Sequence, residues 1–76
     1  MPIYLLIPLE TGHPAWRGIT RRSPIQVLAE NEREARAAAW LRYGSASKSE
    51  DDPWLLGKWV YAHVIDAPDP HLPMLE

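Results

Sequence analysis

The stretch Pro24 to Gly44, PIQVLAENEREARAAAWLRYG, joins a short apolar strand to the clearest helix signal in the chain. Residues Ile25 to Ala29 alternate in the period-two pattern that is typical of a strand. Asn31 is a preferred N-cap residue, and Glu34 stands at the capping-box spacing from it. We therefore expect a helix that begins after Asn31 and ends at Gly44, in the left-handed turn that glycine favours.

The pattern inside this helix predicts which side faces a sheet. At 100° per residue, three residues share one arc, Ala35, Ala38 and Leu41, with Ala39 beside it. Trp40 points away from the centre of that arc and requires a cover, for which the apolar run Trp54 to Leu56 is available. Glu32 and Arg36 are spaced as a favourable i,i+4 ion pair.

Two more apolar runs, Ile3 to Leu9 and Trp59 to Ile65, predict strands on either side of this unit. The expected order is strand, strand, helix, strand. The simplest arrangement is an α+β domain with a three-stranded, mainly antiparallel sheet, the first strand in the middle and the helix on one face.

The connecting segments differ in composition. The loop Glu10 to Ser23 carries Arg17 to Arg22, which we expect as a short irregular strand. Ser45 to Pro53 is polar and predicts a mobile loop. Prolines in the segment from residue 66 to residue 76 predict an extended tail.

The chain of 76 residues is long enough for one domain, with residues 1–65 as the folded unit and residues 66–76 as the tail. An apolar content of 46% favours a folded chain, and the absence of cysteine excludes disulfides and thiolate metal sites. The first residues are too short an apolar run for a signal peptide or a membrane span. We expect a soluble, cytoplasmic protein with no membrane association.

All three strands are apolar on both faces, yet one helix covers only one face. We place Ile3, Leu5 and Ile7 on the helix side with the small residues of the other strands. The opposite, open face is then the candidate interaction surface, formed by seven residues: Tyr4, Leu6, Leu28, Trp59, Tyr61, His63 and Ile65. Exposed apolar patches rich in aromatic side chains are typical of interaction sites.

What covers this face stays open at the level of sequence. A second copy of the chain or another protein is one alternative, and a lid made by the tail or by the loop from residue 10 to residue 23 is the other. We favour a non-catalytic binding or assembly module that forms a homodimer. A small-molecule ligand is not identified.

The alternative function is an accessory nucleic-acid-binding protein. Its candidate contacts are Trp16, which could stack on a base, and the basic side chains of Arg17, Arg21 and Arg22. The net charge of −2 argues against a dominant nucleic-acid footprint.

No arrangement of residues indicates an enzyme, a cofactor or a metal site. No nucleophile stands in a catalytic motif, and no glycine-rich loop is present to hold phosphate. The three histidines, His13, His63 and His71, do not have the spacing of metal ligands. We therefore expect no catalytic residue and no cofactor.

The segment Val27 to Ala39 resembles a strand-to-helix junction found in small uncharacterised bacterial proteins. In these proteins a strand ending in V-x-A leads into an E-x-E-A-R helix, and Trp16 and Trp54 here match their flanking tryptophans. The resemblance implies the same α+β fold and no assigned activity.

Overall fold

A computed structural model describes residues 1–46 and 48–75. Its elements in chain order are β1 (Ile3–Pro8), the 3-10 turn η1 (Pro14–Trp16), β2 (Ile25–Leu28), α1 (Glu32–Tyr43), the 3-10 turn η2 (Pro53–Leu55), β3 (Val60–Ile65) and β4 (Met74–Leu75). Ser47, in the predicted polar loop, and Glu76, in the predicted tail, lie outside the described residues.

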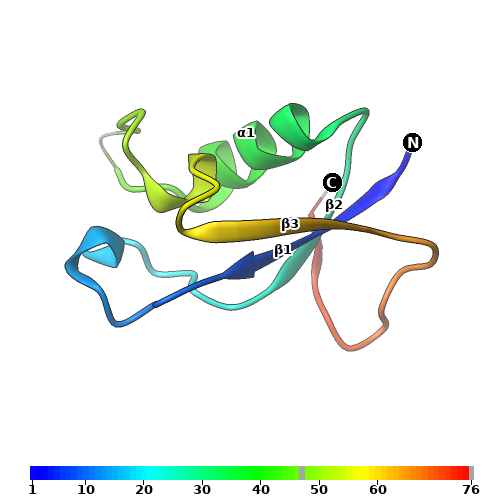
Figure 1. Cartoon of the computed structure of the whole chain (residues 1–76), viewed down its shortest axis with the longest axis horizontal. Coiled ribbons are helices and arrows are strands. Elements are labelled where there is room, and N and C mark those ends of the chain that lie inside the picture. The colour runs from blue at the N-terminus through cyan, green and yellow to red at the C-terminus, as the bar shows by residue number, and fades with distance from the viewer. Residues whose placement is uncertain (47, 76) are drawn as a thin grey trace.

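The chain folds as a small α+β unit with one helix and a mixed sheet in the order β3-β1-β2-β4 (Figure 1). β1 is antiparallel to both of its neighbours, as the sequence predicts. The prediction of three strands is wrong in one respect, because the tail supplies a fourth. β4 pairs parallel with β2, so residues 66–73 connect the two outer parts of the sheet.

The two connections that link parallel strands use opposite faces of the sheet. α1 connects β2 to β3 above the sheet in Figure 1, and the segment from residue 66 to residue 73 passes below it. The face away from α1 is the open face. Its extent depends on which side chains each strand directs toward it.

The strand register corrects the predicted orientation of β1. Leu6 pairs with Ile25 on one side and with Ala62 on the other, and all three lie toward α1. Leu6 and Ile25 are fully buried. Tyr4 lies on the same side, opposite Val27. The residues predicted to face the helix, Ile3, Leu5 and Ile7, therefore lie on the open face, because adjacent strand residues alternate.

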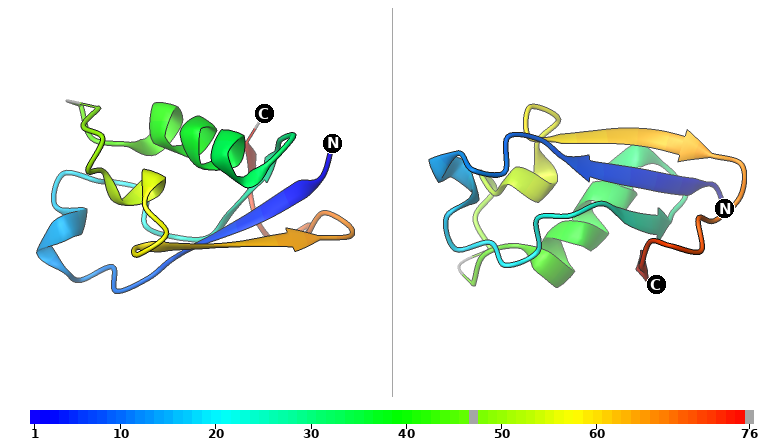
Figure 2. Two further views of the ribbon diagram at one scale, coloured as in Figure 1. Left: turned by 45° about the horizontal axis from the view of Figure 1, so that its top comes forward. Right: turned by 90° about the horizontal axis from the view of Figure 1, so that it is seen from below.

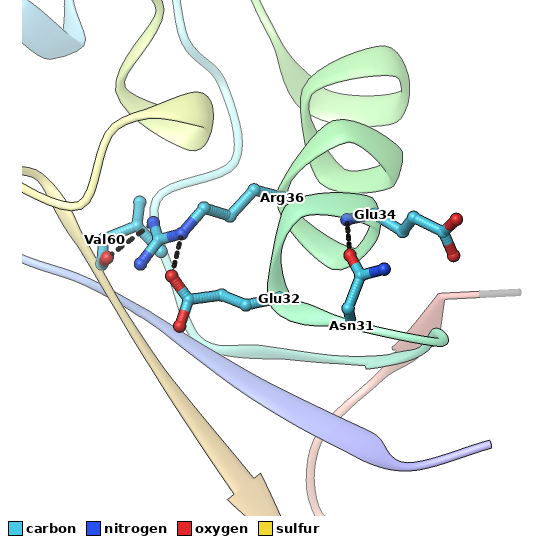
Figure 3. A network of polar contacts seen from close by, with 5 residues as sticks. All are labelled: Asn31, Glu32, Glu34, Arg36 and Val60. Carbon is cyan, nitrogen blue, oxygen red and sulfur yellow. Dashed lines mark hydrogen bonds and ion pairs between the residues drawn. The ribbon is translucent and has the colours of Figure 1, made fainter.

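The N-terminus of α1 forms as predicted. The Asn31 side chain accepts a hydrogen bond of 2.9 Å from the Glu34 backbone N–H, and Arg36 pairs with Glu32 at 3.0 Å (Figure 3). The same Arg36 guanidinium donates to the Val60 carbonyl at 2.8 Å, which ties the helix to β3. The sequence predicts Arg36 only as the ion-pair partner of Glu32, but in the structure it also links the helix layer to the sheet.

The predicted helix face and C-terminus need correction. The buried residues of α1 are Ala35, Arg36 and Ala39, whereas Leu41 is 63% exposed. The helix is thus rotated relative to the prediction, with Arg36 directed toward β3. Gly44 ends the helix at φ −66°, in extended backbone rather than a left-handed turn. Glycine is needed there for close approach, because an added Cβ would lie 2.9 Å from Oδ2 of Asp52.

The Asp52 carboxylate holds the end of α1 against the following loop. It accepts hydrogen bonds from Trp40 Nε1 at 2.9 Å and from the Ser45 hydroxyl at 2.8 Å. Trp40 Nε1 also donates to the Ser49 carbonyl, and η2, which belongs to the predicted cover, packs beside the helix.

The long loop after β1 contains η1 and no strand at residues 17–22, contrary to the prediction. Trp16 and Ile19 are buried and join the core. Trp16 Nε1 donates to the Leu9 carbonyl at 2.9 Å. Arg22 donates from Nε to the Ile19 carbonyl at 2.8 Å and from its two other nitrogens to carbonyls of the same loop. These contacts satisfy backbone groups that a strand would otherwise pair.

Candidate interaction surface

The open face of the sheet is formed by side chains from three strands. They are Ile3, Leu5 and Ile7 of β1, Leu28 of β2, and Tyr61, His63 and Ile65 of β3. Tyr61 is 53% exposed and Leu28 is 46% exposed, while the three β1 side chains are half-buried between their neighbours. An apolar face of this kind gains free energy when a partner removes it from water.

The aromatic part of this surface lies on β3. The rings of Tyr61 and His63 stack, with their centroids 6.2 Å apart and their planes at 16°. Their strand partners across the ladder are Ile7 and Leu5, respectively. The two exposed rings therefore stand beside an aliphatic row, an arrangement suited to apolar contact with limited loss of side-chain entropy.

The described part of the tail covers the open face at the β2 edge. Gln26 points to this face from β2 and is 1% exposed. Its Nε2 donates to the carbonyls of Asp69 at 2.8 Å and Leu72 at 3.0 Å, and its Oε1 accepts from the Asp69 N–H at 2.6 Å. In Figure 2 (right) the segment after β3 passes around one end of the sheet to reach β4. The tail is thus a lid for Gln26, while Tyr61 and His63 stay exposed.

The loop after β1 covers the other end of this face. Trp59 precedes β3, is 8% exposed, and has its ring centroid 4.5 Å from that of His13. Lys58 Nζ lies 5.1 Å from the centroid of the same ring. Trp59 therefore belongs to the closed part of the molecule, and the prediction that it contributes to the open surface is wrong.

Of the seven predicted surface residues, four lie on the open face: Leu28, Tyr61, His63 and Ile65. Tyr4 and Leu6 lie on the helix side, for the reason given above. Sequence reasoning missed Ile3, Leu5 and Ile7. The sequence carries no local signal that separates them from Tyr4 and Leu6, because the leucine and isoleucine side chains on the two faces of β1 are nearly equal in volume.

The candidate nucleic-acid contacts do not form one surface. Trp16 is fully buried, so its ring has no face for a base, and the Arg22 guanidinium is occupied by backbone carbonyls. Arg17 is exposed and Arg21 is half-buried. Only these last two keep a cationic group free for a phosphate.

A different cationic group is present beside Tyr43. The Arg21 guanidinium carbon lies 5.7 Å from the Tyr43 ring centroid, and that of Arg42 lies 5.8 Å from it. Arg21 Nε is buried and has no hydrogen-bond partner among the described residues. A hollow of about 430 Å³ next to this group is lined by Arg42, Tyr43, Met74 and Leu75.

Among the described residues, no three histidine or carboxylate side chains come together as metal ligands. Within the same residues, no helix is long and apolar enough to cross a membrane.

Comparisons of the chain with protein-family models, with curated proteins and with solved structures find no match. The resemblance to small bacterial proteins therefore stays a prediction, and the function is argued from the open face and its surroundings.

Proposed function

We propose that this chain is a non-catalytic assembly module whose contact surface is the open face of the sheet, and that its first partner is a second copy of itself. The proposal assigns no chemical step to the chain. A small domain of this size gains stability when a partner buries apolar surface that its own elements leave in water.

One observation supports the proposal above the others. The tail, which is the available intramolecular cover, bonds to Gln26 and leaves Tyr61 half-exposed and Leu28 nearly so. The exposed rings of Tyr61 and His63 lie next to the half-buried Ile7 and Leu5 of β1, so these side chains adjoin one another rather than being scattered. Contiguous exposed apolar surface is characteristic of contact sites, whereas scattered apolar residues are normal on any protein.

The test is the mass in solution measured by size exclusion with light scattering over a range of concentrations. A dimer raises the mass from 8.7 kDa toward twice that value as the concentration rises. Tyr61→Glu places a charge on the open face and is expected to restore the monomer.

The matched control is Leu41→Glu, because Leu41 is at least as exposed as Tyr61 but lies on the helix. This control is expected to keep the dimer. A monomeric mass at every concentration would contradict the homodimer, and equal loss of dimer in both variants would contradict the assignment of the contact to the open face.

A second candidate function, nucleic-acid binding, is favoured by one observation. Arg21 and Arg42 flank Tyr43 without an ion pair to a carboxylate among the described residues, in a chain with more acidic than basic side chains. Uncompensated arginines beside an exposed hollow suit a phosphate group.

This second candidate predicts binding to a single-stranded oligonucleotide that weakens steeply with salt. Arg21→Gln together with Arg42→Gln should abolish it, while Arg33→Gln, an exposed change on the same helix as Arg42, should leave it nearly unchanged. No binding at low salt would remove the candidate.

A further inference from the structure

β3 is a long edge strand without protection. It lies at one end of the sheet and runs over six residues, VYAHVI, with no charged residue and no proline. Natural edge strands are usually shortened, charged, interrupted by proline or covered, because their free backbone groups pair with other strands. An unprotected edge of this length therefore calls for an explanation.

The hydrogen bonds at the first residues of β3 show which of its backbone groups face outward, away from β1. The N–H of Val60 donates to the Leu56 carbonyl at 3.1 Å, and its carbonyl accepts from Arg36 (Figure 3). Both groups of Val60 thus point away from β1, where its partner Pro8 has no N–H to offer. The preceding residue points inward, because the Trp59 carbonyl accepts from the Leu9 N–H at 2.8 Å.

In an antiparallel ladder, residues alternate between pairs that exchange hydrogen bonds and pairs that do not. Since Val60 points outward, Ala62 and Val64 do so too, while Tyr61, His63 and Ile65 bond to β1. The outer edge of β3 therefore presents the N–H and carbonyl groups of Ala62 and Val64.

The opposite side of the sheet supports this alternation. The N–H of Ala29 donates to the carbonyl of Pro2 at 3.2 Å, so even-numbered residues of β1 bond toward β2. The N–H of Gln26 points away from β1 and donates to the Pro73 carbonyl at 2.9 Å. The odd-numbered residues of β1 are thus the ones left to bond β3.

Side-chain exposure distinguishes an edge contact from a contact over the open face. Tyr61 is 53% exposed and lies on the open face, whereas Val64 is 50% exposed and lies on the helix side. A partner stacked on the open face would cover Tyr61 and leave Val64 in water. A strand added to the edge of β3 borders both residues.

We propose that a second copy pairs with β3 edge to edge and antiparallel, on a two-fold axis that passes at His63. This inference rests on the proposed function in taking a second copy as the partner, but it moves the contact from the whole open face to the edge of β3, which Tyr61, His63 and Ile65 of that face border. In this register Ala62 pairs with the partner's Val64, and Val64 pairs with the partner's Ala62. Each pair exchanges two hydrogen bonds, so all four outward groups of each copy are satisfied.

Neighbouring registers would pair fewer of the outward N–H and carbonyl groups of β3. An axis at Tyr61 would pair Ala62 with the partner's Val60, whose backbone groups are already bonded. An axis at Ile65 would bring Val64 opposite the partner's Asp66, which lies beyond the end of the strand. The axis at His63 also sets Tyr61 against the partner's Ile65 on the open face, an aromatic to β-branched pair that favours a sheet.

The first test uses single cysteine variants, which are clean reporters because the chain has no cysteine of its own. In this register His63 faces the partner's His63 as a non-hydrogen-bonded pair, with Cβ atoms about 4.5–5.5 Å apart. His63→Cys should therefore form a covalent dimer under mild oxidation. Leu5→Cys, in the middle of the open face, should stay monomeric in the same gel.

The second test uses proline to remove one edge donor. Val64→Pro deletes an outward N–H and is expected to raise the dimer dissociation constant about tenfold or more while the monomer stays folded. His63→Pro deletes an inward N–H that bonds to β1 and is expected to unfold the chain. Val64→Lys provides an edge charge without any backbone change and should also give a folded monomer.

The outcomes separate this inference from the proposed function. A dimer that is cross-linked by Leu5→Cys and survives Val64→Lys would overturn the edge contact and keep the homodimer. A chain that is monomeric at every concentration would overturn both. Cross-linking through His63→Cys with loss of the dimer in Val64→Lys is the expected result.

Discussion

Replacing Gln26 by glutamate tests whether the tail is held on the sheet by this one side chain. Gln26 donates two hydrogen bonds to the carbonyls of Asp69 and Leu72 and accepts one from the Asp69 N–H. Glutamate has nearly the same volume, so Gln26→Glu leaves the packing in place. It removes both donated bonds, since an ionised carboxylate has no donor.

The expected cost follows from these bonds. Two neutral hydrogen bonds contribute about 0.5–1.5 kcal/mol each. The carbonyls of Asp69 and Leu72 then face a negative charge, while the bond from the Asp69 N–H becomes stronger. We expect Gln26→Glu to lower the free energy of unfolding by about 2–4 kcal/mol at neutral pH.

Urea unfolding followed by tryptophan fluorescence measures this cost, and hydrogen exchange at Leu75 reports whether the tail separates first.

The sign of the pH dependence of the unfolding free energy provides a second test of the role of Gln26. Burial without a cation raises the pKa of the introduced carboxyl above its unfolded value, so folding favours the protonated form. The loss of unfolding free energy relative to the parent chain therefore has its full size above the pKa of the folded state. It shrinks as the pH falls through that pKa, because protonation of the carboxylate restores one hydrogen-bond donor.

A deficit below about 0.5 kcal/mol, or one that does not shrink in acid, would refute the reasoning that Gln26 holds the tail. The control is Glu30→Gln, the reverse exchange at an exposed position two residues beyond β2. This control is expected to change the free energy of unfolding by less than about 0.5 kcal/mol.

Four further substitutions test the face assignment, the helix end and the first loop by urea unfolding. Leu6→Ala should cost about 2–5 kcal/mol, whereas Leu5→Ala should cost about 1 kcal/mol; the reverse order would show that the faces of β1 are misassigned. Gly44→Ala should cost about 1–3 kcal/mol despite the better helix propensity of alanine, because the new Cβ meets the Trp40 carbonyl and the Asp52 carboxylate. Arg22→Lys should cost about 1–2 kcal/mol, because an ammonium group cannot reach all three carbonyls that the guanidinium spans; an unchanged midpoint would show that these bonds do not hold the loop.

The start of α1 is predictable from sequence because its determinants are local. The bond from the Glu34 N–H to the Asn31 side chain and the pair of Arg36 with Glu32 each join residues within four positions. The rotation of the helix is not local. It goes with contacts to distant residues, such as the bond from Arg36 to Val60, twenty-four positions away in the chain.

The orientation of β1 illustrates a second limit. Its two faces, Ile3, Leu5 and Ile7 against Tyr4 and Leu6, are nearly equal in hydrophobicity, so alternation alone does not choose between them. The choice is made by the register of the two ladders. Leu6 stands opposite Ile25 and Ala62, both of which face α1, so Leu6 and Tyr4 lie on that side.

The fourth strand has a different origin. Prolines at residues 68, 70 and 73 correctly exclude the tail from a central strand, but an edge strand needs donors on one side only. β4 consists of the two residues that follow Pro73, and its register is fixed from outside by the Gln26 side chain. A polar residue in the middle of an apolar strand was the available signal that something binds there.

The tail and β3 together suggest why assembly would use one edge of the sheet. The tail occupies the β2 edge with a strand of two residues preceded by proline, which is too short and too poor in donors to recruit another strand. The same topology places β3, six uncharged residues long, at the opposite end, where the outward groups of Ala62 and Val64 have no partner among the described residues. Since a two-fold pairing of β3 closes on itself and leaves only the short β4 edges outside, it would yield a dimer of defined size rather than an open fibre.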